Sequence, residues 1–169
     1  MTTPRTIVLL GSEQPIAGSA GSHWHAVDGS PAYRRVLLVD DQSTVGVSSF
    51  GDGVSVWVGE QIDSLVEAGD FGAATALLAV GQEPAPGHEV EFDAWMDEEH
   101  VPGLGAAPGT LSAHRYRSAN GSPEYFAVYH LRDLDVNKTP EWKAVSGSER
   151  GAANKPHSRK RIRGLYTAD

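Results

Sequence analysis

The sequence predicts an α+β fold in which one antiparallel sheet carries two helices on the same face. A strongly amphipathic helical segment, two strands joined by a turn-rich loop, and a second helix with a proline start indicate this class. The expected strands and helices follow one another in this order: strand 76–80, helix 88–100, strand 109–117, strand 125–131, helix 140–145 and strand 161–167. A β-α-β-β-α-β order is typical of the ferredoxin-like arrangement.

The first helix carries the clearest pattern in the chain. Phe92, Trp95 and Met96 fall at positions i, i+3 and i+4, and acidic residues fill the opposite side. We expect both aromatic side chains to pack in the core. His100 is expected at the end of this helix, directly before residues 101–103, whose proline and glycine indicate a stop. An imidazole at a helix end can transfer protons near neutral pH, or it can simply cap the helix carbonyls.

The strand at 109–117 presents a polar face. Ser112, His114 and Tyr116 alternate along the strand and therefore share one side, and His130 can join them from the neighbouring strand. A few polar groups on a concave surface suit a ligand site. The alternative is that this face is exposed to solvent.

Patterns before residue 76 are weaker. They predict, in order, a strand at 6–10, a loop at 12–30, a helical turn leading into a strand across 30–39, a hairpin of 44–50 and 54–58, and a short helix at 61–68. Residues 30–33 (SPAY) resemble residues 139–142 (TPEW). If this is a true repeat, residues 1–73 form a degenerate first ferredoxin-like unit before a complete one at 74–169; otherwise they are an elaboration.

Composition excludes several classes of function. The 169 residues have a net charge of −8, which argues against a protein that binds nucleic acid. The absence of cysteine excludes thiol chemistry and cysteine-ligated metals. No apolar run approaches the roughly 20 residues of a membrane span, and the five-residue apolar run near the N-terminus is too short for a signal peptide. We therefore expect a cytoplasmic protein that acts on a small molecule.

Three further motifs have ordinary explanations. His23 and His25 have a spacing that can chelate a metal, but no further ligands complete a site, so we expect none. The glycines at 103, 105 and 109 follow a helix, whereas a dinucleotide-binding loop follows a strand. A basic cluster is expected to protect a strand edge, with an anionic substrate or a subunit contact as the alternative; it comprises Arg159, Lys160, Arg161 and Arg163.

Several spaced motifs together resemble a known family. They are EFDAW at 91–95, EHVP at 99–102, PGTLSAHRY at 108–116 and YFAVY at 125–129. This set is similar to the dimeric α/β-barrel superfamily, and more closely to its EthD-like and polyketide cyclase or anthrone-oxygenase-like branches. The resemblance covers residues 74–169. It implies two ferredoxin-like sheets, from two subunits or two repeats, closed around a pocket for flat and mostly apolar molecules.

The resemblance leads to a functional expectation. Members of the superfamily include isomerases, cyclases, cofactor-independent oxygenases and haem enzymes. We expect a homodimeric, cofactor-independent isomerase, cyclase or lyase acting on an aromatic or polyketide-like molecule, with His100 as general acid or base. The expected substrate-binding residues are Trp95, Asp97, Ser112, His114, Tyr116 and His130. The alternatives are a non-catalytic binding or accessory protein and, less favoured, a cofactor-free oxygenase or a haem-binding enzyme.

Overall fold

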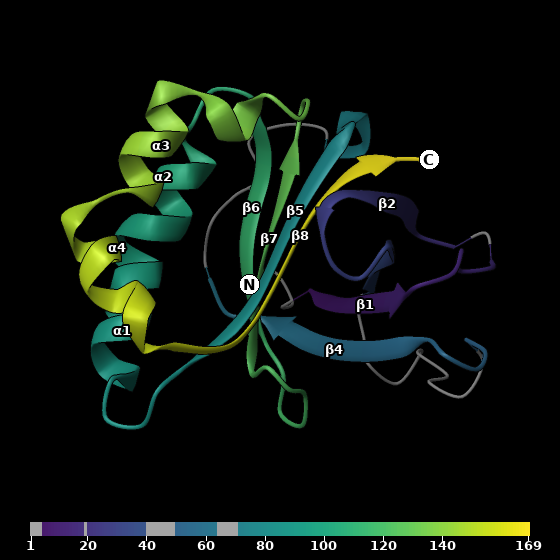
Figure 1. Ribbon diagram of the computed structural model, residues 1–169, viewed down its shortest axis with the longest axis horizontal. Helices are drawn as coiled ribbons and strands as arrows, with labels where there is room; N and C mark the ends of the chain where they lie inside the picture. Colours follow the sequence, from purple (N-terminus) through teal and green to yellow (C-terminus); the bar gives the residue numbers. More distant parts are fainter. Residues whose placement is uncertain (1–4, 19, 40–49, 64–70) are drawn as a thin grey trace.

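The computed structural model describes residues 5–18, 20–39, 50–63 and 71–169. Eight strands form one closed antiparallel barrel, and helices cover one side of it (Figure 1). The strands are β1 Thr6–Ser12, β2 Ser22–Gly29, β3 Tyr33–Val39, β4 Ser55–Gln61, β5 Ala76–Pro84, β6 Thr110–Arg117, β7 Tyr125–Leu131 and β8 Ser158–Ala168. Their order around the barrel is β1-β3-β2-β8-β5-β7-β6-β4.

The C-terminal half confirms the ferredoxin-like prediction. Its strands lie in the order β8-β5-β7-β6, and its helical segments lie together on the outer face of these strands (Figure 1). The helical segments are α1 Glu89–Trp95, the π-helical turn Met96–His100, α2 Val101–Gly105, α3 Pro140–Ser146 and α4 Glu149–Asn154, with short 3-10 turns at Phe71–Ala73, Val136–Lys138 and Lys155–His157. Thr139 caps α3 as expected, because its side chain accepts a hydrogen bond from the backbone N–H of Trp142.

The N-terminal strands complete the barrel within the same chain. Their order, β4-β1-β3-β2, repeats the relative order of the C-terminal strands, although residues 30–33 lead into a strand and residues 139–142 form a helix start. Pairing of β2 with β8 and of β4 with β6 joins the two halves. One chain therefore closes a barrel without a second copy.

Apolar side chains form three clusters in separate layers. The first fills the space between the helices and the C-terminal strands and includes Phe92, Trp95 and Trp142. The second fills the barrel interior, where Trp57 and Phe126 meet edge to face. The third lies against the outer face of the N-terminal strands. No helix among the described residues combines the length and apolar character needed to cross a bilayer.

Two predictions in the N-terminal half were wrong. The loop expected at 12–30 contains strand β2, which inserts Trp24 into the barrel and pairs on both sides with other strands. The helical turn expected after Ser30 is absent, because the chain passes from a cis Ser30–Pro31 bond directly into β3. The strand at 54–58 is confirmed by β4, whereas most of the expected strand at 44–50 and helix at 61–68 lies outside the described residues.

The first helix does not end at His100. The backbone N–H of Val101 donates to the carbonyl of Met96, a π-type hydrogen bond, and the chain continues into α2 with Pro102 in its first turn. Proline is tolerated there because its missing N–H needs no partner at a helix start, and the wider π turn accommodates the change. Gly103 and Gly105 are helical and allow α2 to lie close to Val145 and Ala113. The expected stop was therefore a helix junction.

The basic cluster lies on a stretch of β8 that has a strand partner on one side only. Residues 159–163 run along β5, whereas the ladder between β2 and β8 begins at Gly164. This position agrees with the prediction that the charges protect a strand edge. Arg161 and Arg163 of this cluster also line the cavity described below.

Candidate functional site

A cavity of about 250 Å³ lies between the helical layer and strands β5, β7 and β8. Apolar side chains from the strands and helices form most of its wall, namely Leu78, Val80, Trp95, Met96, Leu104, Ala127, Tyr129 and Trp142. Polar and charged residues also line the cavity, namely Gln82, His100, Asn137, Ser146, Lys155, Arg161 and Arg163. The wall is therefore of mixed character, with apolar side chains and almost as many polar or charged ones, and such a cavity can hold a small molecule that is partly apolar and partly polar.

Unpaired polar atoms concentrate in this cavity. Six buried side-chain nitrogen or oxygen atoms lack a hydrogen-bond partner across the described residues. Four of the six belong to the cavity wall: Trp95 Nε1, His100 Nδ1, Tyr129 OH and Asn137 Oδ1. Leaving a buried polar group unpaired costs roughly 1–3 kcal/mol, so folded proteins seldom gather such groups in one place without a use for them. The grouping marks the cavity as the candidate site.

His100 is neutral in its surroundings. Burial, with the positive charges of Lys155 and Arg161 as smaller causes, lowers the pKa of His100 from 6.5 to about 4. Its ring lies 4.6 Å from the ring of Trp95, measured between centroids. At neutral pH the imidazole is therefore in its basic form, ready to accept a proton from a bound molecule.

Tyr129 provides a hydroxyl at the floor of the cavity. It projects from β7 and is almost completely buried, and its ring meets Trp142 edge to face at 5.5 Å. Burial raises the pKa of Tyr129 well above its usual range, so the phenol keeps its proton. A protonated phenol in an apolar wall can donate a hydrogen bond to a ligand oxygen.

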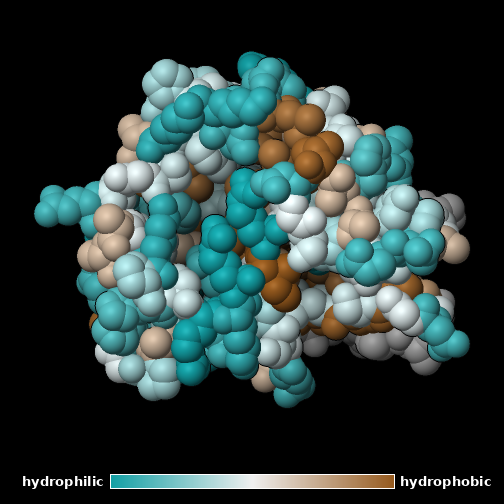
Figure 2. Space-filling view, viewed as in Figure 1, coloured by the Kyte–Doolittle hydropathy of each residue, from teal (hydrophilic) through white to brown (hydrophobic). Residues whose placement is uncertain are grey.

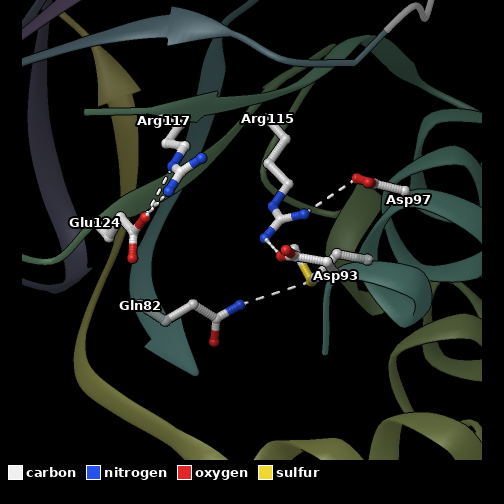
Figure 3. A network of polar contacts seen from close by, with 7 residues as sticks. Gln82, Asp93, Asp97, Arg115, Arg117 and Glu124 are labelled. Atoms are coloured by element: carbon white, nitrogen blue, oxygen red, sulfur yellow. Dashed lines mark hydrogen bonds and ion pairs between the residues drawn. The ribbon is translucent and has the colours of Figure 1, made fainter. Parts of the chain in front are cut away.

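An ion-pair network fastens α1 to the sheet beside the cavity (Figure 3). Arg115, fully buried on β6, donates from Nη2 to Asp93 at 2.5 Å and from Nη1 to Asp97 at 3.1 Å. Its guanidinium carbon lies 4.3 Å from the centre of the Tyr125 ring. Asp97, predicted to bind substrate, thus anchors the helix and does not line the cavity.

Four of the predicted site residues lie on the opposite face of the same sheet. Ser112, His114, Tyr116 and His130 are buried inside the barrel, so the solvent-exposed alternative for this face is wrong. Ser112 Oγ lies 3.0 Å from His130 Nδ1, and His114 Nδ1 lies 3.0 Å from a carboxylate oxygen of Asp63. Burial, with a smaller contribution from His114, lowers the pKa of His130 to about 4.

The predicted residues therefore divide into two groups. His100 and Trp95 line the cavity, whereas the polar group of β6 and β7 lies behind the sheet, and one ligand cannot contact both groups. Side chains alternate along a strand, so Tyr129 of β7 points to the cavity while its neighbours Val128 and His130 point to the other face of the sheet.

Sequence reasoning missed part of the cavity wall. Tyr129 and Trp142 were assigned to a strand and a helix, and Asn137 precedes that helix, without any role. The basic cluster was noticed, and its alternative explanation as an anion site pointed to Arg161 and Arg163. Nothing in the sequence placed Lys155 beside them, since it belongs to a short turn before β8.

The histidine pair near the N-terminus belongs to neither group. His25 Nδ1 lies 2.6 Å from the carboxylate of Asp169, and both side chains are about half exposed. Among the described residues, no group of three or more histidine, aspartate or glutamate side chains is placed to bind a metal.

Comparisons with known proteins identify the fold. No family model matches the sequence, and no curated protein sequence matches it significantly. Among solved structures, an anthrone oxidase-like protein has a TM-score of 0.58 at 12% identity, covering 99% of this chain and 92% of its own. A dimeric chlorite dismutase from Nitrobacter winogradskyi has a TM-score of 0.55 at 11% identity, covering 96% of this chain and 99% of its own.

A third similar structure is not described as an enzyme. It is a major regulator of staphylococcal pathogenesis, with a TM-score of 0.59 at 12% identity, covering 98% of this chain and 99% of its own. At these identities the likeness shows the fold and leaves the chemistry open. The chain therefore has the α+β barrel fold of these structures, and its place in the dimeric α/β-barrel superfamily and in the EthD-like branch stays a prediction.

Proposed function

We propose that the protein is a cofactor-independent enzyme that moves a proton on a small aromatic or polyketide-like substrate bound in the cavity between helices and sheet. One observation carries the proposal: a neutral, half-buried histidine whose Nδ1 atom is buried shares a cavity with three further unpaired polar atoms. Isomerisation, cyclisation and elimination next to a carbonyl all begin with such a proton transfer.

The side chains have distinct roles in this proposal. Trp95 and Leu104 contact the faces or edges of the substrate rings, because both line the apolar wall. A ring nitrogen of His100 accepts a proton from a carbon next to the substrate carbonyl. The bonding electrons move toward the carbonyl oxygen, and the protonated Tyr129 hydroxyl donates a hydrogen bond to the resulting enolate.

The size of the cavity restricts the substrate. Pockets for drug-sized ligands usually measure roughly 300–1,000 Å³. The volume of about 250 Å³ lies just below this range, which favours a molecule of one or two fused rings over a macrocycle such as haem.

Deuterium exchange tests the proton transfer directly. A panel of bicyclic aryl ketones is incubated with the protein in D₂O, and loss of the protons next to the carbonyl is followed by NMR. The wild-type protein should accelerate exchange, and His100→Gln should reduce the acceleration about a hundredfold or more, the usual contribution of a general base. Substituting the exposed His25 by Gln is the matched control and should leave the rate unchanged.

Two outcomes would redirect the proposal. No acceleration with any ketone, together with a ligand-induced rise in melting temperature, would identify a binding protein of the same fold. Exchange that survives His100→Gln but is lost in His130→Gln would move the active site to the barrel interior, where His130 contacts Ser112.

A further inference from the structure

Basic side chains surround the mouth of the cavity in a protein that is acidic overall. The chain has a net charge of −8, yet Lys155, Arg161 and Arg163 all line this one opening. Hydrophilic residues gather over the path of β8 in the centre of the face shown, next to the helical layer (Figure 2). Positive side chains that gather in one place on a negatively charged protein require an explanation of their own.

Two of these cations lack an acidic partner, whereas their neighbours have one. Arg159 and Lys160 pair with Glu83, and Arg163 pairs with Asp28. The structure gives no carboxylate partner to Arg161 within the described part of the chain, and the ammonium of Lys155 bonds the backbone carbonyl of Ser146.

The same two cations repel each other and are partly removed from water. Burial and the charge of Arg161 lower the pKa of Lys155, and burial and the charge of Arg163 lower the pKa of Arg161. Both residues are exposed overall, and two like charges with no carboxylate partner repel each other. A bound anion would offset both the desolvation and the repulsion.

We propose that the ligand of this cavity is an aromatic carboxylate, with its rings against the apolar wall and its carboxylate held between Lys155 and Arg161. The inference rests on the proposed function only in placing the substrate in this cavity. The guanidinium of Arg161 offers two parallel N–H donors to a carboxylate, and the ammonium of Lys155 supplies a second charge. The neutral polar atoms deeper in the wall remain available for the reacting part of the molecule.

Binding of such an anion would also activate His100. Burial is the main cause that lowers the pKa of His100 to about 4, and the charges of Lys155 and Arg161 are smaller causes. A carboxylate placed between the two cations cancels part of their field and raises the pKa of His100 by part of the charge contribution, which makes the imidazole a stronger base. The substrate would therefore increase the basicity of the group that attacks it.

A matched pair of ligands tests the inference. Naphthoate and naphthamide have the same rings and differ in charge, and isothermal titration calorimetry measures the dissociation constant of each. Wild-type protein should bind naphthoate at least about tenfold more tightly, and the preference should fall as salt is added because the contacts lie at the surface. The double variant Lys155→Gln/Arg161→Gln should bind the two ligands within about twofold of each other.

Arg159→Gln is the control, because it removes a nearby charge of the same strand that is paired with Glu83. It should keep the preference for naphthoate. NMR titration of the His100 ring should also show a higher pKa in the naphthoate complex than in the free protein.

Each contrary result has a definite meaning. Equal binding of both ligands by wild-type protein overturns the anion site but leaves the aromatic cavity and its proton transfer standing. A preference that survives the double variant also overturns it, since the anion then binds elsewhere. If neither ligand binds, the inference fails, and ketone exchange decides separately whether the proposed function fails with it.

Discussion

Two histidines, the buried His130 and the half-buried His100, make the stability of the protein depend on pH. His100 faces Lys155, Arg161 and the Trp95 ring, and His130 lies beside His114, Ser112 and Trp24. Both have a pKa of about 4 in the folded protein and about 6.5 when unfolded. Above pH 6.5 both states are neutral. As pH falls toward 4 the unfolded chain takes up protons that the folded protein does not, so stability is lost in this window.

We therefore expect the free energy of unfolding to decrease between pH 7 and pH 4.5, as measured by urea denaturation. His130→Leu should flatten the decrease, because each pKa unit of difference corresponds to about 1.4 kcal/mol. His25→Gln should leave the slope unchanged. A pH profile that is the same with and without His130 would contradict this explanation.

Some residues of the cavity could be predicted from the sequence, and others could not. His100 and Trp95 were identifiable because they belong to one strongly periodic helix. Asn137 and Lys155 belong to short 3-10 turns with no periodic pattern, and only the folded chain brings them to the cavity.

Two arginines of one strand differ greatly in what they contribute to the first helix. Arg115 is buried with two carboxylates of the helix, whereas Arg117 is 58% exposed and pairs with Glu124 (Figure 3). Loss of the buried arginine leaves its helical partners without a counter-ion, although Asp93 and Asp97 keep access to water. The cost should therefore lie below the 3–5 kcal/mol usual for a broken buried pair.

We expect Arg115→Met to lower the free energy of unfolding by about 2–3 kcal/mol, and Arg117→Met by less than about 1 kcal/mol, in urea denaturation. Methionine keeps most of the apolar stem, so the comparison isolates the charge. Equal effects of the two substitutions would show that the network does not fasten the helix.

Elements with strong patterns were predictable and weak ones were not. Strand β6 alternates polar and apolar residues and β7 is a continuous run of strand-favouring residues, so their hairpin was found with its boundaries. Strand β2 is rich in small and polar residues, so only its ladders with β3 and β8 define it. The junction at His100 was mistaken for a helix end because Pro102 and Gly103 usually end a helix, and here tertiary packing overrides that tendency.

At the scale of the whole molecule, the seam between β4 and β6 is the shortest strand pairing among the described residues. Strands β4 and β6 pair through two residue pairs, whereas β5 and β7 pair through seven. The backbone N–H of Ile62 also donates to the carbonyl of Arg115 across this seam, at 3.0 Å. Local opening should occur where the fewest hydrogen bonds must break.

Native-state hydrogen exchange followed by NMR should therefore show the Ile62 amide exchanging at least about tenfold faster than the amides between β5 and β7. Equal protection at both places would mean that the barrel opens only by complete unfolding.

The expected homodimer stays a prediction, since the barrel closes without a second copy. Sedimentation equilibrium should give twice the 18.0 kDa of the chain if subunits associate. A mass of one chain at micromolar concentrations would contradict the dimer without affecting the fold.

A single sheet lies between the cavity on the helix side and the apolar core of the barrel, so alternate residues of one strand face two different environments. On β7, Ala127 and Tyr129 border the cavity, and the alternate residues Phe126 and Val128 belong to the barrel core. Replacing Ala127 with a larger residue would narrow the space for a ligand and leave the packing behind the sheet intact. Substrate range can therefore change by single substitutions at alternate positions of one strand, while the fold that supports them is inherited unchanged.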